Sequence, residues 1–164
     1  MRIGEFVRTL ALITATALAA PASAEPAFSD FPVAAALQTA PAHPDYTADA
    51  ATYRTRIRQA VNAGPNAAGH YAIIPIGCGG SCTVIEMVDL RDGRMLTFPV
   101  GGEEYYQLAL DYRLDSRLII ADWKDVSGGA FNTCVRRFYE IANGNFVLVG
   151  ETRRTVEDHA PCSE

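Results

Sequence analysis

Several short motifs that mark metal and catalytic sites are missing from this sequence. Its three histidines show neither His-x-x-x-His nor His-Glu-x-x-His spacing, so no zinc site is expected. The Asp-x-Asp-x-Asp-Gly pattern of a calcium loop is absent, as are the Gly-x-Ser-x-Gly turn of α/β hydrolases and any Cys-x-x-Cys pair. The sequence therefore predicts no metal, no cofactor and no catalytic residue from a motif.

Positive charge is also scarce. The 14 basic residues, of which Lys124 is the only lysine, face 19 acidic residues, and the formal net charge is −5. An acidic surface repels the phosphates of nucleic acids and anionic lipid headgroups, so neither is expected as the main partner. Beyond residue 24, no apolar run is long enough to span a membrane.

The chain opens with the pattern of a secretory signal over residues 1–24. Arg2 and Arg8 charge its start, a mostly apolar run covers residues 9–20, and Ala22-Ser23-Ala24 is a small-residue cleavage site. The apolar run is too short to span a bilayer, and no cysteine follows the site to carry a lipid. We therefore expect a periplasmic or secreted protein with no membrane anchor after cleavage.

Composition divides the remainder into two parts. Residues 25–46 are rich in proline and alanine and are expected to form a linker or a loosely docked arm. Residues 47–164 are expected to form a single disulfide-stapled β-rich domain. Helical spacing of apolar residues predicts one amphipathic helix over 48–62, with Thr47 as its N-cap and Asp49 in its first turn.

Strands and hairpins are predicted for most of this domain. We expect a first strand at 70–76, followed by three strand pairs. The first pair, 83–90 and 94–100, is joined by the turn Asp92-Gly93, and the second, 105–112 and 118–123, is joined by residues 114–117. The third pair, 133–141 and 145–152, is joined by the turn Asn143-Gly144. About seven antiparallel strands and one helix predict a mainly β (α+β) fold, either a small sandwich or an open barrel. Weak alternation over 146–149 predicts a last strand buried on both faces, and residues 153–164 are expected to form a polar tail.

The stretch from Gly64 to Cys82 is the most unusual in the chain. It opens with a Gly-Pro-Asn turn and crosses a short apolar run in which Pro75 lacks an N–H donor, which predicts a sheet edge or a bulge. It ends in Gly77-Cys-Gly-Gly-Ser-Cys82, whose glycines allow the tight turn that a Cys78–Cys82 disulfide requires.

Two motifs of this stretch, Gly-Pro-Asn-x-Ala-Gly-His-Tyr and Gly-Cys-Gly-x-x-Cys, resemble those of a family of uncharacterised secreted bacterial proteins. Asp115-Ser-Arg-Leu-Ile-Ile120 and the later Tyr-x-x-x-Asn-Gly hairpin are similar to the same family. The resemblance covers residues 62–149. It supports the domain boundaries and the cysteine pair, and it implies no catalytic role for any residue.

Four cysteines in the exported part of the chain favour two disulfides. We expect Cys78–Cys82 and, by elimination, Cys134–Cys162. Neither a helix N-terminus nor a neighbouring cation that would lower a thiol pKa is predicted beside the first pair, so a structural role is favoured over a redox role.

Two classes of function remain open. The first is a binding or interaction domain for a small ligand or for an envelope or secreted protein, with His70, Tyr71, Ser81 and Trp123 as candidate binding residues. The second is a small periplasmic enzyme, either of thiol–disulfide type through Cys78/Cys82 or a hydrolase in which Ser81 is activated by His70. Carboxylate pairs that a glycosidase could use occur at Glu103-Glu104 and Asp122/Asp125, where surface decoration is the favoured interpretation.

Overall fold

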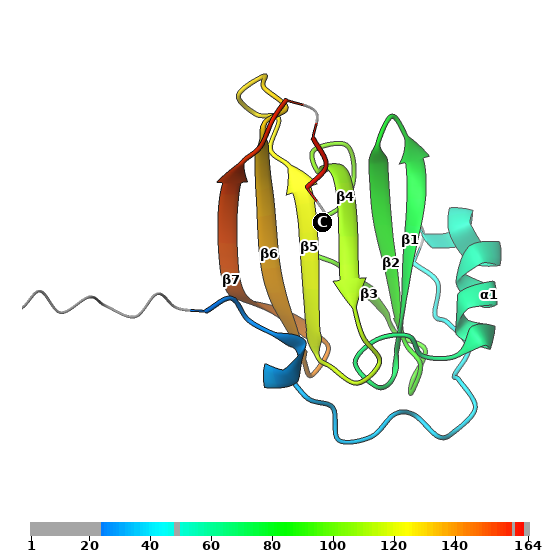
Figure 1. The fold of residues 1–164 in the computed structure, drawn as a ribbon. Coiled ribbons are helices and arrows are strands. Elements are labelled where there is room, and N and C mark those ends of the chain that lie inside the picture. The colour runs from blue at the N-terminus through cyan, green and yellow to red at the C-terminus, as the bar shows by residue number, and fades with distance from the viewer. Residues whose placement is uncertain (1–23, 48–49, 159, 163–164) are drawn as a thin grey trace, which may run out of the picture.

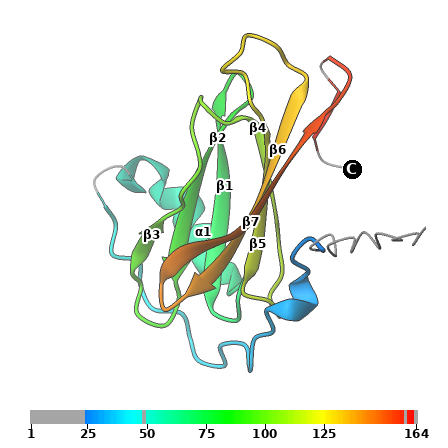
Figure 2. The same ribbon diagram turned by 90° about the vertical axis from the view of Figure 1, so that its left-hand side faces the viewer.

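The computed structural model describes residues 24–47, 50–158 and 160–162, which form mainly β-structure. Seven antiparallel strands make two sheets, in the orders β1-β2-β3 and β4-β5-β6-β7. The helix α1 lies on the outer side of the first sheet, so helix, first sheet and second sheet form three layers (Figure 1; Figure 2). The expected mainly β fold is confirmed, and the sheets form a small sandwich and not a closed barrel. Residues 1–23 of the expected signal, and Asp49, lie outside the described residues.

The helix begins with a short 3₁₀ segment. This segment, η2 (Ala50–Tyr53), leads directly into α1 (Arg54–Ala63), so the helix expected over 48–62 is confirmed in its main part. Thr47 acts as the predicted cap, because its Oγ1 accepts a hydrogen bond of 3.2 Å from the backbone N–H of Ala50.

The first sheet contains β1 (Tyr71–Gly79), β2 (Cys82–Asp89) and β3 (Met95–Thr97). Strand β1 is an edge strand that pairs with β2 alone, and a register shift interrupts this pairing near the end of β1. Pro75 is exposed on it, as expected for a residue that cannot donate a ladder hydrogen bond. Strand β3 is shorter than the strand expected over 94–100, because the residues after Thr97 leave the ladder and enter the core.

The second sheet contains β4 (Tyr106–Tyr112), β5 (Leu118–Lys124), β6 (Thr133–Ala142) and β7 (Asn145–Thr155). Its two predicted hairpins are confirmed, as is the hairpin of β2 and β3 in the first sheet. The two sheets also meet at one corner, where the backbone N–H of Gln107 donates to the carbonyl oxygen of Ser81 at 3.0 Å.

Two separate apolar cores hold the layers together. One fills the space between the sheets, and the other lies between α1 and the first sheet. Burial of β1 on both faces explains its nearly continuous apolar sequence. The inner core includes Ile73, Met87, Phe98, Val100, Ile119, Trp123, Val135 and Tyr139, and the helix-side core includes Ile57, Val61, Ala72, Ile74, Ile76, Val88 and Leu90.

The end of the chain departs from the prediction in two ways. Strand β7 is not buried on both faces: Val147 is 48% exposed and Leu148 is 51% exposed. The physical reason is its position, because β7 is an edge strand that pairs with β6 alone. The polar tail expected over 153–164 also begins later, since β7 continues to Thr155.

Residues 25–46 run below the lower ends of both sheets from the side of β7 to α1 (Figure 1). They contain a 3₁₀ turn, η1 (Phe28–Asp30). We call this segment the arm. Four of its backbone N–H groups donate to carbonyl oxygens of the rest of the chain: Val33 to Asp115 at 2.9 Å, Leu37 to Gly69 at 2.7 Å, Ala42 to Leu90 at 2.9 Å and Asp45 to Gly93 at 2.8 Å.

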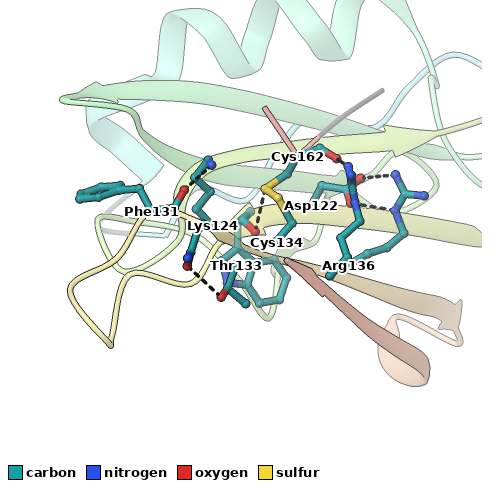
Figure 3. Close-up of a disulfide and its surroundings, with 10 residues drawn as sticks. Asp122, Lys124, Phe131, Thr133, Cys134, Arg136 and Cys162 are labelled. Atoms are coloured by element: carbon teal, nitrogen blue, oxygen red, sulfur yellow. Dashed lines mark hydrogen bonds and ion pairs between the residues drawn. A yellow bond between two sulfur atoms is a disulfide. The ribbon is translucent and has the colours of Figure 1, made fainter. Parts of the chain in front are cut away.

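Both expected disulfides are confirmed. The tip disulfide, Cys78–Cys82, closes the hairpin of β1 and β2, and the tail disulfide, Cys134–Cys162, ties the end of the chain to β6. Figure 3 shows the tail disulfide between Cys134 and Cys162. The carbonyl oxygen of Trp123 lies 3.4 Å from the Sγ of Cys162.

Polar side chains next to the tail disulfide form hydrogen bonds with other groups of the chain (Figure 3). Arg136 donates to both oxygens of Asp122, at 2.8 and 3.2 Å. Lys124 is 0% exposed, and its Nζ donates to the carbonyl oxygen of Phe131 at 2.6 Å.

Within the described part of the chain, no helix combines the length and the apolar character needed to cross a membrane.

Candidate functional site

The four predicted binding residues do not come together. His70 and Tyr71 lie at the start of β1, whereas Ser81 lies in the turn after its far end. At about 3.3 Å per residue, the nine residues of β1 separate the two ends by roughly 30 Å. The hydrolase hypothesis requires His70 within hydrogen-bond reach of Ser81, and the fold does not bring these side chains together.

Trp123 is part of the inner core. It is 5% exposed, its ring contacts that of Tyr105 edge-on at 5.2 Å between centroids, and the guanidinium of Arg137 covers it at 5.1 Å. Its place at the end of a strand suggested a ligand contact, but its ring is used in packing the two sheets. It therefore presents no free ring face to a ligand.

The turn around the tip disulfide is a compact exposed loop. Gly79, Gly80 and Ser81 adopt positive φ values of 97°, 54° and 68°, which only glycine adopts at little cost. Cys78 is exposed and Cys82 is 9% exposed. No helix begins at this turn, because β1 and β2 flank it directly, so the local geometry that lowers a thiol pKa at a helix N-terminus is missing from this part of the described chain.

One of the two carboxylate pairs considered for a glycosidase, Asp122/Asp125, is held in ion pairs. Asp122 is bound by Arg136, while Asp125 accepts hydrogen bonds from Ser127 and, at 2.7 Å, from Arg153. These hydrogen bonds lower the pKa of Asp125 to about 2, and the bond from Ser127 makes the largest contribution. A general acid for glycoside hydrolysis needs a raised pKa, so Asp125 is unsuited to that role.

A hollow of about 310 Å³ opens beside the start of β1, and we call it the His70 hollow. Four segments that are distant in the sequence build it: the end of the Gly-Pro-Asn motif, the turn between β2 and β3, the start of β5, and the end of β6 with its turn. Its lining residues are Ala68, His70, Tyr71, Arg91, Arg117, Ile141, Ala142 and Asn143. Three of the four motifs that carried the family resemblance therefore meet here.

His70 is the least satisfied polar group of this hollow. Its Nε2 is buried and has no hydrogen-bond partner in the described structure, since the nearest carboxylate oxygen, Oδ2 of Asp89, is 3.8 Å away. Burial and the positive charge of Arg91 lower the pKa of His70 and outweigh the opposite influence of Asp89 and Asp92. The imidazole is therefore neutral near pH 7 and keeps one nitrogen unused.

Arg91 lines the hollow and is held by Asp89, which is not itself part of the lining. The carboxylate of Asp89 is 0% exposed and accepts three hydrogen bonds from Arg91: from the backbone N–H at 3.0 Å, from Nε at 3.0 Å and from Nη2 at 2.6 Å. Burial alone would raise the pKa of Asp89, but these hydrogen bonds outweigh burial and the pKa is lowered.

Arg117 also lines the hollow. Its Nε and Nη2 donate to Oε1 of Glu140 at 3.1 and 3.0 Å, and its Nη1 donates to the carbonyl oxygen of Pro32 in the arm. Its own carbonyl oxygen accepts a 2.9 Å hydrogen bond from the backbone N–H of Ile141. The arm and β6 thus fix this arginine in the lining of the hollow.

Sequence reasoning identified His70 and Tyr71 but missed Arg91 and Arg117. Both arginines adjoin residues that were interpreted only as turn formers, and only Arg117 lies within a motif of the family resemblance. Asn143, with a φ of 52°, was likewise interpreted only as a turn residue.

Comparison of the chain with protein-family models, with curated proteins and with solved structures finds no match. Among the described residues, no three histidine, cysteine or acidic side chains are grouped so that they could share a metal ion.

Proposed function

We propose that this protein is an exported binding domain that holds a small polar ligand in the His70 hollow. One observation carries the proposal: a concave site of about 310 Å³ is lined by a histidine, His70, whose Nε2 is buried and has no hydrogen-bond partner in the described structure. A buried polar atom without a partner costs about 1–3 kcal/mol, and a ligand that bonds to it removes this cost.

Export is supported by the signal pattern of residues 1–24 and by the two disulfides, which persist in oxidising compartments. Intact-mass analysis of protein recovered from the periplasm or medium of an expressing bacterium tests this part. A mass that begins at Glu25 is expected, and a mass that retains residues 1–24 would contradict export by cleavage.

The binding site is tested by a fragment screen on ¹⁵N-labelled protein, followed by amide chemical shifts. Binders should shift the amides of Ala68, His70, Tyr71 and Ile141. In the wild type the ring centroids of His70 and Tyr71 are 4.1 Å apart. The variant His70→Phe keeps an aromatic ring beside Tyr71 but removes the unpaired nitrogen. We expect it to lose these binders.

Ser81→Ala is the matched control, because it changes a polar residue at the other end of β1. It should bind the same fragments as the wild type. Shifts that cluster elsewhere, or binding that survives His70→Phe unchanged, would refute the proposed site.

A further inference from the structure

We propose that the His70 hollow recognises the carboxylate of a small organic acid, with Arg91 and Arg117 facing the carboxylate and an apolar wall facing the rest of the molecule. This inference rests on the proposed function and adds to it the chemical class of the ligand. The apolar wall is made by the residues Ala68, Ile141 and Ala142.

The arrangement of charge favours an anion. The charged residues that line the hollow are the two arginines, whereas their carboxylate partners, Asp89 and Glu140, are not part of the lining. Each ion pair is thus oriented with its positive end toward the hollow. A ligand in the hollow meets N–H donors first, and the acidic groups lie behind them.

Both arginines retain N–H groups for a ligand. A guanidinium carries about five N–H donors. Arg91 uses Nε and Nη2 toward Asp89, which leaves Nη1 outside these bonds, and its side chain is 52% exposed. Arg117 is held at three nitrogens by Glu140 and Pro32, yet each of its two terminal nitrogens carries a second N–H. The existing bonds fix both guanidinium groups before a ligand arrives, which reduces the entropy lost on binding.

The charges around the hollow also favour a ligand with one negative charge over a ligand with two. Arg91 and Arg117 each have one carboxylate partner, so the two pairs are neutral as pairs, and the imidazole of His70 is neutral near pH 7. A single carboxylate is compensated when His70 takes up one proton, whereas a phosphate dianion would leave a negative charge unmatched beside Asp89. The apolar wall also suits an organic acid better than an inorganic ion.

Binding should therefore be coupled to protonation of His70. The charged and titratable groups around this imidazole are Asp89, Arg91 and Asp92 from the second strand and its turn, Tyr71 from its own strand, and Arg117 from the second sheet. A bound carboxylate adds one negative charge to this set and favours the protonated imidazole. The affinity for an acid should rise as the pH falls from 8 to about 5.5, and the complex should take up a proton.

Benzoate and benzamide form the probe pair, because they have nearly the same shape and differ in charge. Titration calorimetry of the mature, disulfide-bonded protein should show benzoate binding at least about tenfold more tightly than benzamide at pH 6, as charge-assisted hydrogen bonds are about twice as strong as neutral ones. Inorganic phosphate should bind more weakly than benzoate. In two buffers of different ionisation enthalpy, benzoate binding should show proton uptake and benzamide binding should not.

Arg117→Gln should weaken benzoate binding about tenfold and leave benzamide binding nearly unchanged. Arg113→Gln is the matched control: Arg113 lies outside the hollow, with its guanidinium over the ring of Phe28 at 4.2 Å, and its replacement should change neither affinity. If Arg117→Gln fails to fold, the comparison of benzoate with benzamide on the wild type still decides the question.

The possible failures are distinguishable. Equal affinities for benzoate and benzamide, with shifts in the His70 hollow, would overturn the carboxylate inference and leave the proposed function intact. Tighter binding of phosphate than of benzoate would also overturn it, in favour of an inorganic anion site. Absence of any binder in the hollow, for acids and for neutral fragments alike, would overturn both proposals.

Discussion

Replacing Asp89 by asparagine tests the electrostatic framework of the His70 hollow. The substitution keeps the shape of the side chain but replaces Oδ2 by an NH₂ group, which then faces the Nη2 of Arg91 at the 2.6 Å separation of the present hydrogen bond. Two donors cannot share that position. Arg91 must move away, or the amide must rotate and lose its bonds to Nε and to the backbone N–H.

The loss of stability expected for Asp89→Asn follows from the burial of Asp89 and the exposure of its partner Arg91. The carboxylate of Asp89 is 0% exposed, so its amide replacement remains desolvated, whereas Arg91 is 52% exposed and can regain water when it moves. Breaking a fully buried ion pair costs about 3–5 kcal/mol, and losing a hydrogen bond to a charged group costs about 1.5–3 kcal/mol. With one partner exposed, we expect a loss of about 2–3 kcal/mol in the free energy of unfolding at pH 7.

The pH dependence of this loss has a definite sign. The pKa of Asp89 is lowered in the folded protein, so the stability that it provides is complete above its unfolded pKa of about 4 and disappears as the pH falls through the lower folded value. The part of the stability difference between wild type and Asp89→Asn that comes from the carboxylate should therefore shrink as the pH falls below about 4. Loss of the Asp89 charge should also lower the pKa of His70 further, because Asp89 favours the protonated imidazole.

Urea unfolding of both proteins between pH 2.5 and 8, together with an NMR titration of the His70 ring, measures these effects. Asp92→Asn is the control: Asp92 is exposed and its Oδ1 accepts one hydrogen bond from the backbone N–H of Arg94 at 3.0 Å, so a change of less than about 1 kcal/mol is expected. A difference between wild type and Asp89→Asn that does not shrink in acid would refute the role assigned to the Asp89 charge.

Three further predictions concern stability. Valine at Gly79 or Gly80 should lower the free energy of unfolding by about 1–3 kcal/mol because both positions have positive φ, whereas Ser81→Ala should be nearly neutral in thermal melts; tolerated valines would show that the turn is not constrained. Removing the tail disulfide, which spans 28 residues, should cost about 3.5 kcal/mol, against about 2 kcal/mol for the tip disulfide, which spans 4; the reverse order in denaturant midpoints would contradict the loop-entropy argument. Gly93→Ala should cost at least about 2 kcal/mol more than Gly80→Ala, since both have positive φ but a Cβ at Gly93 would lie 1.9 Å from the backbone oxygen of His43; equal costs would show that the arm is not held there.

The hairpins could be predicted from the sequence because their information is local. Asp92-Gly93 and Asn143-Gly144 are turn sequences, and the glycines have φ values of 78° and 74°. The tip disulfide was predictable for the same reason, since the glycines that permit its turn lie between its two cysteines. Apolar spacing likewise predicted α1 within a few residues.

The His70 hollow could not be predicted in this way. Its residues come from the start of β1, from the turn after β2, and from the adjoining ends of β5 and β6, so their proximity depends on how the two sheets lie against each other. Arg91 and Arg117 have no spacing that distinguishes them from surface arginines. The error at β7 has a similar origin: an apolar run shows that a strand can be buried, but not whether another layer covers it.

The buried position of Lys124 has a practical consequence for following the opening of this protein. It is the only lysine in the sequence and is 0% exposed, with its Nζ bonded to the carbonyl oxygen of Phe131 (Figure 3). An amine-acylating reagent added to the folded protein therefore has no exposed lysine to modify, and the α-amino group is its main target. A second acyl group is added only to molecules in which Lys124 has become exposed and its bond to Phe131 has broken. The mass gained during a short chemical pulse thus counts opening events at one known atom, without any introduced label.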